Sequence, residues 1–314
     1  MAVLDLPNRK RASTRSSNLA LIRKHWTDYL FIAPSFLGVL AFIVFPMIFA
    51  LIISFTEWDI LRAPKVVGLQ NYVDLFTRDN LFWVSLRNSA VYVLLTVTSG
   101  IVASLGLALL MNQKVKGIGL FKVAMFIPVV TPAVAVAFIW SWIYNSDIGL
   151  LNAGLVALGL PKIGWLTDPG MAMISLAILG VWKSAGYYAI IFLAALQDVP
   201  DVYYEAAAID GATAWQKFWK ITLPLITPAI LFVIIIAVIG SFQVFDQVYL
   251  MTNNGGPGTA TYVYNLHLYN NAFRHFRMGT GAAMAYVLFG ILFVVTYLQF
   301  RLGRRRTAET YDFG

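Results

Sequence analysis

The chain of 314 residues contains no cysteine and little charge. Without cysteine it can form neither a disulfide framework nor a thiolate site. Asp, Glu, Lys and Arg make up only 12% of the residues, against about a quarter in soluble domains, whereas 59% are hydrophobic and the mean hydropathy is +0.72. This composition excludes a soluble globular protein and predicts an all-helical (all-α) integral membrane protein.

The sequence also lacks the usual marks of an enzyme. It has no G-x-x-x-x-G-K-[ST] phosphate-binding loop. Lys183 and Ser184 imitate the last two residues of such a loop, but Gly180 stands at the wrong spacing and all three lie inside an apolar run. The histidines have neither metal-ligand spacing nor a nucleophile beside them, and we expect surface or interfacial roles for His25, His267 and His275. We therefore predict no catalytic residue, no metal site and no cofactor held by this chain.

Long apolar runs are what the sequence does contain. A bilayer crossing takes about 18 to 20 apolar residues, and we interpret six runs as crossings: 29–55, 84–111, 121–144, 171–196, 223–245 and 282–300. The first run is too long for the apolar part of a signal peptide and no cleavage site follows it. We expect about six transmembrane helices in one domain, residues 29–302.

Lys and Arg gather beside the ends of these runs, so the net charge of +8 favours a membrane protein over a nucleic-acid-binding one. Because cytoplasmic loops carry the excess of Lys and Arg, both termini and the loop 198–224 are predicted to be cytoplasmic. Residues 1–28 are rich in Arg and Ser and are expected to form a disordered basic tail. Residues 303–314 are expected to form a second cytoplasmic tail.

Small residues and prolines mark particular points of the runs. Gly100, Ser104 and Ala108 repeat a small side chain at every fourth position, which favours close helix packing. Prolines remove backbone donors and bend helices. We expect kinks in the third run at Pro128 and Pro132, and at the start of the fifth at Pro224 and Pro228.

The loop 198–224 predicts a helix, a sharp turn and a second helix. Three alanines from Ala206 favour the first helix, which Asp198 or Asp201 is expected to cap. Gly211 takes the position at which a left-handed residue ends a helix. Thr213, followed three residues later by Gln, fits a capping box that starts the second helix.

The second helix carries an aromatic stripe of Trp215, Phe218 and Trp219, with Thr222 on the same face. Periodicity alone leaves three interpretations of this stripe. It packs on the protein's own helices, it lies in the lipid interface, or it inserts into a groove on a partner protein.

A family resemblance favours the partner. The string E-A-A-x-x-D-G-A, which begins at Glu205, is followed by Phe218, Ile221, Leu223-Pro224 and Pro228. This pattern resembles the signature loop of permease subunits of bacterial ABC importers, in the form used for carbohydrate uptake. Similar stretches follow for most of the chain after the tail: DIGLLN from Asp147, WLTDP from Trp165, and the segment from Thr252 to Gly255-Gly256-Pro257.

The resemblance implies that the loop is a coupling helix seated in a cleft of a cytoplasmic ATPase. The residues that would contact the ATPase or join the coupling helix to the fifth run are Glu205, Ala206, Ala207, Asp210, Gly211, Trp215, Phe218, Leu223 and Pro224. The implied partners are a second, similar permease, two ATPase subunits that bind ATP and Mg, an external solute-binding protein and a sugar-like solute. The implied location is the inner membrane of a bacterium.

Two alternatives remain at this stage. A secondary carrier driven by an ion gradient would need more intramembrane acids or histidines, and we find no internal repeat of the inverted type. An integral membrane enzyme would need clustered acids or histidines at one interface. Neither alternative explains the segment that begins at Glu205.

A solute pathway is expected near the fourth and fifth runs. Lys183 lies near the middle of a run, where a charge should face a cavity or a partner, and Asp246 is the candidate counter-ion. Aromatic residues at span ends usually form anchoring belts, but rings beside amides also suit a sugar. The candidate pathway residues are Lys183, Tyr187, Phe242, Gln243, Phe245, Asp246 and Gln247.

Overall fold

A computed structural model describes residues 26–113 and 115–311, with side chains up to residue 303. The predicted basic tail lies almost entirely outside the described residues. The chain forms two compact units, Met1–Ile52 and Ile53–Gly314. The first unit contains helix α2 (Trp26–Val39), the π-helical turn η1 (Leu40–Val44) and most of α3 (Phe45–Ser54). Together these form an apolar stretch, Trp26–Ser54, long enough to cross a membrane, as predicted for run 29–55.

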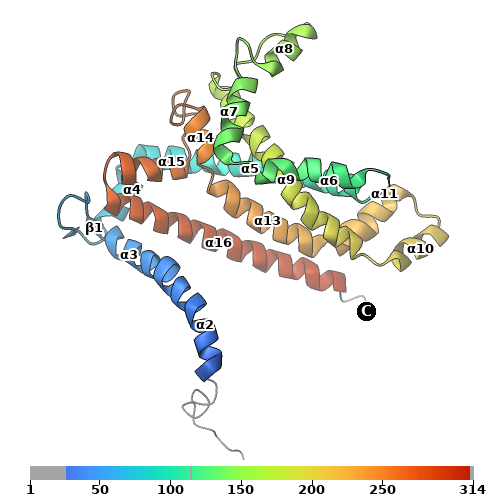
Figure 1. Ribbon diagram of the computed structural model, residues 1–314, viewed down its shortest axis with the longest axis horizontal. Helices are drawn as coiled ribbons and strands as arrows, with labels where there is room; N and C mark the ends of the chain where they lie inside the picture. Colours follow the sequence, from blue (N-terminus) through green and yellow to red (C-terminus); the bar gives the residue numbers. More distant parts are fainter. Residues whose placement is uncertain (1–25, 114, 312–314) are drawn as a thin grey trace, which may run out of the picture. The chain divides into compact units, whose positions relative to one another are not determined.

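The second unit is almost entirely helical, as predicted (Figure 1). It starts with a two-stranded antiparallel ribbon, β1 (Thr56–Glu57) and β2 (Lys65–Val66), in which Thr56 pairs with Val66. The helices before loop 198–224 are α4 (Gln70–Thr77), α5 (Asn80–Met111), α6 (Ile118–Val130), α7 (Ala133–Ile143), α8 (Leu150–Ala157) and α9 (Pro169–Gln197). The helices within this loop and after it are α10 (Asp201–Ile209), α11 (Ala214–Lys217), η2 (Phe218–Thr222), α12 (Leu223–Leu225), α13 (Thr227–Phe242), α14 (Asp246–Met251), α15 (Tyr264–Tyr269), η3 (Asn270–Arg274) and α16 (Met278–Tyr311).

Four stretches in the described part of the chain are long and apolar enough to span a membrane, and two bent helix pairs bring the possible number to six. The third predicted run is one of these pairs, since α6 and α7 meet at 100°. Pro132 has no N–H to donate, and it holds the preceding Thr131 in an extended conformation with ψ of 132°. The run is therefore broken rather than merely kinked, as in a broken span or a re-entrant loop.

The fifth predicted run is the other bent pair. Its two helical parts, Ala214–Leu225 and Thr227–Phe242, meet at 65°. Pro228 occupies the first turn of α13, where the missing N–H costs no helical hydrogen bond. The kink expected here is confirmed, and it lies at Ile226, between the two prolines.

The core of the second unit rests on close helix packing. Gly100, Ser104 and Ala108 are all buried in α5, which packs against α9. At Gly186 in α9 an added Cβ atom would lie 2.0 Å from the carbonyl oxygen of Met125 in α6. Only a residue without a side chain allows this approach of two helix backbones.

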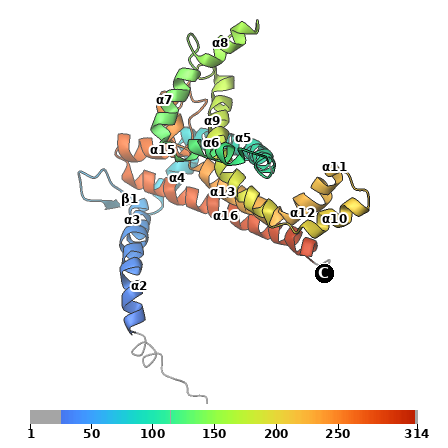
Figure 2. The ribbon, with the colours of Figure 1, turned by 45° about the vertical axis from the view of Figure 1, so that its right-hand side comes forward.

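Figures 1 and 2 show how the second unit is ordered from end to end. Helices α10 and α11 lie at one end of the long helices, beside the C-terminal end of α16. Helix α4 and helix α15 lie at the opposite end. We call these the α10 end and the α15 end.

Candidate coupling segment and solute cavity

Helix α10 leaves its side chains largely uncovered. It contains no buried residue; Glu205 and Ala206 are exposed and Ala207 is half-buried. Ile209 at its tip is 88% exposed. An apolar side chain so exposed outside the apolar runs marks a contact surface when it lies in a continuous patch.

The expected cap of this helix is wrong. Pro200 holds the N-cap position with ψ of 133°, and no side chain donates or accepts a capping bond there. Asp198 instead ends α9, its N–H bonded to the carbonyl of Ala194, and Asp201 is already the first residue of α10. Asp201 still suits the positive end of the helix dipole.

The turn after α10 has the geometry that the sequence predicts. Gly211 is left-handed with φ of +74°. The N–H of Ala212 donates to Ala207 (2.9 Å) and that of Gly211 to Ala208 (3.1 Å), the pair of bonds that closes a Schellman motif. Thr213 and Gln216 form the full capping box of α11. The two helices are thus joined by contacts among neighbours in the sequence.

The aromatic stripe forms a ring cluster on α11 and η2. Trp219 lies 5.5 Å from Trp215 and 5.4 Å from Phe218 between ring centroids. Trp215 and Trp219 are 69% and 49% exposed. Since the Trp215 side chain is largely exposed in the second unit and that of Trp219 is only about half covered, the stripe does not pack fully back on its own helices.

Thr222, on the same face, behaves differently, because it is buried. Its hydroxyl lies 2.9 Å from that of Tyr204 in α10. Thr222 ends the π-helical turn η2, directly before Leu223 and Pro224. This hydrogen bond fastens α10 to the start of the helix pair that continues as α13.

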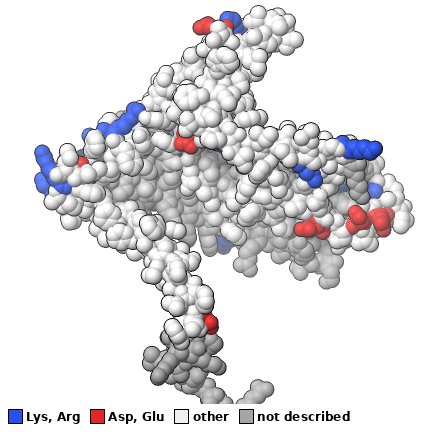
Figure 3. Space-filling view, viewed as in Figure 1, with Lys and Arg blue, Asp and Glu red and all other residues white. Residues whose placement is uncertain are grey.

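Acidic side chains gather at the α10 end (Figure 3). The segment supplies four exposed carboxylates: Asp198, Asp201, Glu205 and Asp210. None of them takes part in an ion pair between described residues. Their negative charge is therefore available to a partner.

A cavity of about 360 Å³ lies among α5, α6, α7, α9, α13 and α14. Of the candidate pathway residues, it is lined by Lys183, Tyr187, Gln243, Phe245, Asp246 and Gln247. Phe242 is the exception, since it is buried in the core with Val238 and Met284. The helical period explains this correction, because Phe242 follows the lining residue Ser241 by one position and points about 100° away from it.

Other lining residues escaped the sequence analysis. Tyr92 and Thr96 lie one turn apart on α5, and Ser241 on α13 accepts a hydrogen bond of 3.0 Å from the Thr96 hydroxyl. Gln247 donates to the hydroxyl of Tyr92. The available signal was the spacing of polar residues by four within an apolar run, which places them on one helix face.

The expected counter-ion contact is absent from the described residues. Lys183 and Asp246 both line the cavity, yet no ion pair within 4.0 Å joins them. Lys183 is half-buried, whereas Asp246 is exposed at the start of α14.

Both helices that flank the coupling segment also line the cavity. Helix α9 contributes Gly180, Lys183, Ser184 and Tyr187, and it ends three residues before α10 begins. Helix α13 contributes Ala237, Gly240 and Ser241, and it follows α12 after the bend at Ile226. Helix α10 is therefore connected through the chain to two helices that line the cavity.

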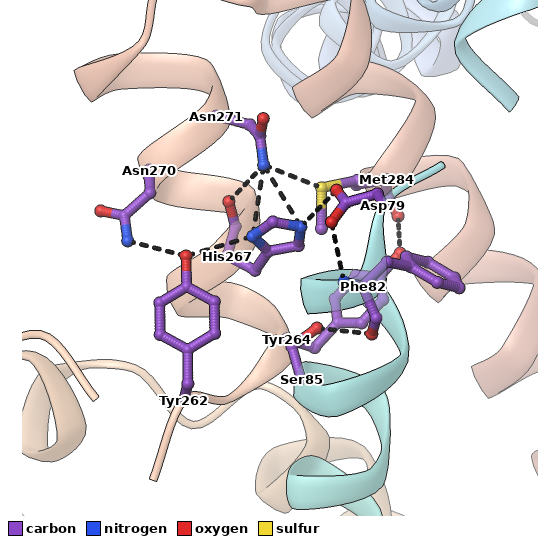
Figure 4. Close-up of polar contacts among 9 residues, drawn as sticks. All are labelled: Asp79, Phe82, Ser85, Tyr262, Tyr264, His267, Asn270, Asn271 and Met284. Carbon is purple, nitrogen blue, oxygen red and sulfur yellow. Dashed lines mark hydrogen bonds and ion pairs between the residues drawn. The ribbon is translucent and has the colours of Figure 1, made fainter. Parts of the chain in front are cut away.

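The α15 end contains a network of hydrogen-bonded, mostly buried polar side chains (Figure 4). His267 Nε2 lies 2.7 Å from Asp79 Oδ2, and its Nδ1 lies 3.1 Å from the Tyr262 hydroxyl, to which Asn270 also donates. Burial raises the pKa of Tyr262. The surface role expected for His267 is wrong, because this side chain is only 4% exposed, whereas His275 is exposed.

Residues 84–308 match the family model described as "Binding-protein-dependent transport system inner membrane component". The chain belongs to this family. The permease is 38% identical to the probable ABC transporter permease protein YesP of Bacillus subtilis, over 93% of each chain. It is 35% identical to the lactose transport system permease protein LacF of Rhizobium radiobacter, over 88% of the permease and 94% of LacF.

A solved structure is also similar to this chain in its fold. The permease is similar to a chain of a bacterial alginate ABC transporter crystallised with its alginate pentasaccharide-bound periplasmic protein, with a TM-score of 0.78 at 25% identity, covering 91% of the permease and 96% of that chain. The predicted resemblance to sugar permeases of ABC importers is confirmed. Nothing in these matches supports the ion-gradient carrier.

Proposed function

We propose that the permease moves a sugar or sugar-like solute into the cytoplasm as one membrane-spanning half of an ATP-driven importer. One observation supports this function. The exposed helix-turn-helix is connected on each side to a helix, α9 or α13, that lines the same cavity. A protein that only binds solute in the membrane has no need of such a junction.

The α10–α11 segment is the docking site for a cytoplasmic ATPase. Ala206 and Ala207 let a partner backbone approach closely, and Glu205 and Asp210 offer unpaired carboxylates to basic groups of the partner. Trp215 and Phe218 add an aromatic contact of the kind that dominates interface energies. ATP and Mg would be bound by that ATPase, of which the complete importer has two copies.

Coupling follows from the connections of α10. Closure of the ATPases moves α10, and the hydrogen bond from Tyr204 to Thr222 passes the movement to η2, α12 and α13. The short link through Pro200 passes it to α9. The two walls of the cavity then shift relative to α5, which opens the cavity to one side of the membrane at a time.

The cavity suits a sugar. Tyr187, Tyr188 and Phe245 offer ring faces to the C–H faces of a pyranose, while Gln243 and Gln247 offer amides to its hydroxyls. The similarity to a lactose permease and to an alginate transporter supports this class. A second, similar permease would complete the pathway.

An external binding protein delivers the solute at the α15 end. The complex of the similar alginate transporter with a solute-loaded periplasmic protein supports this partner. With α10 in the cytoplasm, the C-terminal end of α16 lies on the same side, because the two lie together (Figure 1). The Lys and Arg distribution supports this orientation and a cytoplasmic N-terminus.

Purification of the permease from native membranes tests the proposal. We expect an ATPase to co-purify, and its hydrolysis in proteoliposomes to rise when the solute-loaded binding protein is added. Glu205→Arg and Gly211→Ala should each reduce this rise several-fold or more. Crosslinks from position 205 that reach only lipid or the permease itself would contradict the docking site.

A further inference from the structure

We propose that the cavity selects solutes that carry a negative charge, and that Lys183 is the residue that determines this specificity. This inference rests on the proposed function, since it assumes that the cavity is the solute pathway. The class implied is acidic saccharides, whose anionic group would be held by the ammonium group of Lys183.

The position of Lys183 is the first support. It lies near the middle of α9, an apolar helix of 29 residues. A Lys at the centre of a span costs roughly 2.5 to 3.5 kcal/mol on insertion scales, and such residues mark substrate or ion pathways. Its side chain lines the cavity together with neutral groups such as Ser184, Tyr188 and Gln243.

The charge of Lys183 has no protein counter-ion among the described residues. Asp246, the other charged residue of the lining, makes no ion pair with it. Asp246 is exposed and stands in the first turn of α14, where the helix dipole favours a negative charge. An anionic solute would supply the missing partner.

A second cation stands beside the aromatic wall. Phe245, which lines the cavity, stacks on Tyr249 with ring centroids 5.3 Å apart. The Arg274 guanidinium lies 5.4 Å from the centre of the Tyr249 ring and donates to its hydroxyl at 3.3 Å. Arg274 is exposed and takes part in none of the ion pairs between described residues.

The order of these groups suggests a route. An acidic sugar would meet Arg274 first, pass along the rings of Tyr249 and Phe245, and reach Lys183 in the cavity. A neutral sugar would use the rings alone and would leave both cations without a partner. The cations therefore favour the anionic solute over the neutral one.

The absence of cysteine permits a direct test. Ser184→Cys places a single thiol next to Lys183 with little change in size, and Ala153→Cys places a control thiol on the exposed face of α8. Each variant is assembled into the complete importer in proteoliposomes. The rates of modification by an anionic and by a cationic methanethiosulfonate are then measured, with and without nucleotide.

We expect the ratio of the anionic to the cationic modification rate to be at least about tenfold higher at position 184 than at position 153. A cation within several ångströms raises the local concentration of anions by about that factor. The preference should disappear in the double variant Ser184→Cys/Lys183→Met and persist in Ser184→Cys/Lys183→Arg. A rate ratio equal to that of the control overturns the proposal. A carboxylate from a second permease that neutralised Lys183 would produce this result. A preference that survives Lys183→Met also overturns the proposal, as does a thiol that reacts with neither reagent.

This result is separate from that of the proposed function. If the cavity prefers the anionic reagent but no ATPase co-purifies, the charge selectivity is supported and the ATP-driven importer is refuted. If an ATPase co-purifies but the cavity shows no preference, the importer is supported and the charge selectivity is refuted.

Discussion

The two ends of the second unit are stabilised in opposite ways. At the α10 end, the hydrogen bonds that shape the turn join residues at most five positions apart, and almost every side chain is at least partly exposed. At the α15 end, Asn88 donates to the carbonyls of Thr259 and Tyr262, and Asp79 contacts His267, so the bonds join residues 171 to 188 positions apart.

This contrast agrees with the docking role that we propose for the α10 end. A docking element must present its side chains to another protein, so its shape can rest only on caps and turns within its own sequence. At the opposite end, short helices must be held against the long helices. Buried hydrogen bonds between distant residues do this, but such a network is stable only when every polar group in it has its partner. Variants at the two ends should therefore fail in different assays.

The largest effect is expected at the α15 end, for Asp79→Ala. Asp79 accepts from the N–H of Phe82 at the start of α5 and pairs with the buried His267. Loss of the cap and of the imidazole partner should together lower the stability by about 3 kcal/mol. Thermal unfolding in detergent measures this.

The matched control is Asp74→Ala, which breaks an exposed pair with Arg78. Such a pair contributes only about 0 to 1 kcal/mol. Equal losses for the two variants would show that the buried network adds nothing to the α15 end.

The second effect belongs to the α10 end, for Glu205→Arg. This side chain is exposed and unpaired among the described residues, so folding should be unchanged. Binding of the ATPase should weaken by about 2 kcal/mol, or about thirtyfold, because like charges then face each other across the interface. Quantitative co-purification checks the prediction, with Asp147→Arg in an exposed loop as the same charge change elsewhere. Equal loss for both variants would point to net charge rather than docking.

A somewhat smaller effect is expected for Gly211→Ala. An added Cβ atom would meet nothing within 4 Å, so only the left-handed backbone opposes it. That strain costs about 1.5 kcal/mol, which should reduce solute-stimulated ATP hydrolysis several-fold. Gly211→Asn should lose less of this activity, since Asn adopts the left-handed conformation more readily than Ala. Equal activity in the two variants would show that the left-handed backbone at position 211 is not what the activity requires.

The smallest effect is expected for Tyr204→Phe, which removes the hydrogen bond to Thr222. We expect a loss of about 1 kcal/mol in stability and fewer solutes moved per ATP, with the ATPase still bound. Tyr203→Phe on the exposed side of the same helix is the control. Unchanged solute transport per ATP in Tyr204→Phe would remove this hydrogen bond from the coupling route.

The same contrast explains what could be predicted from the sequence. The α10 end was predictable down to the left-handed Gly211 and the capping box of Thr213, because these motifs depend on neighbours alone. The error at Asp198 arose because α9 extends further than expected and uses this residue for its own C-terminus. Helix ends fray and shift by one or two residues, so local sequence does not define them to the residue.

The α15 end could not be predicted, because no local pattern says that Asp79 meets His267 across most of the chain. The cavity lies between these extremes. Lys183 was identifiable as a charge in an apolar helix, and Gln243 and Gln247 as amides beside rings. For Tyr92 and Thr96 the sequence offered only their spacing by four, since their part in the cavity depends on how α5 packs against α9 and α13.

The π-helical turn η2 allows the joint below α10 to absorb a change of length. A π turn is an α-helix that contains one extra residue, and in η2 it is closed by the N–H of Leu223 donating to Phe218. Deleting a single residue here should restore regular α-helical winding and leave the residues that follow facing nearly as before, whereas a deletion within a regular turn of α13 would rotate everything after it by about 100°. The cavity-facing side of α13 should therefore keep its direction when η2 loses one residue, but not when the length of α13 itself changes.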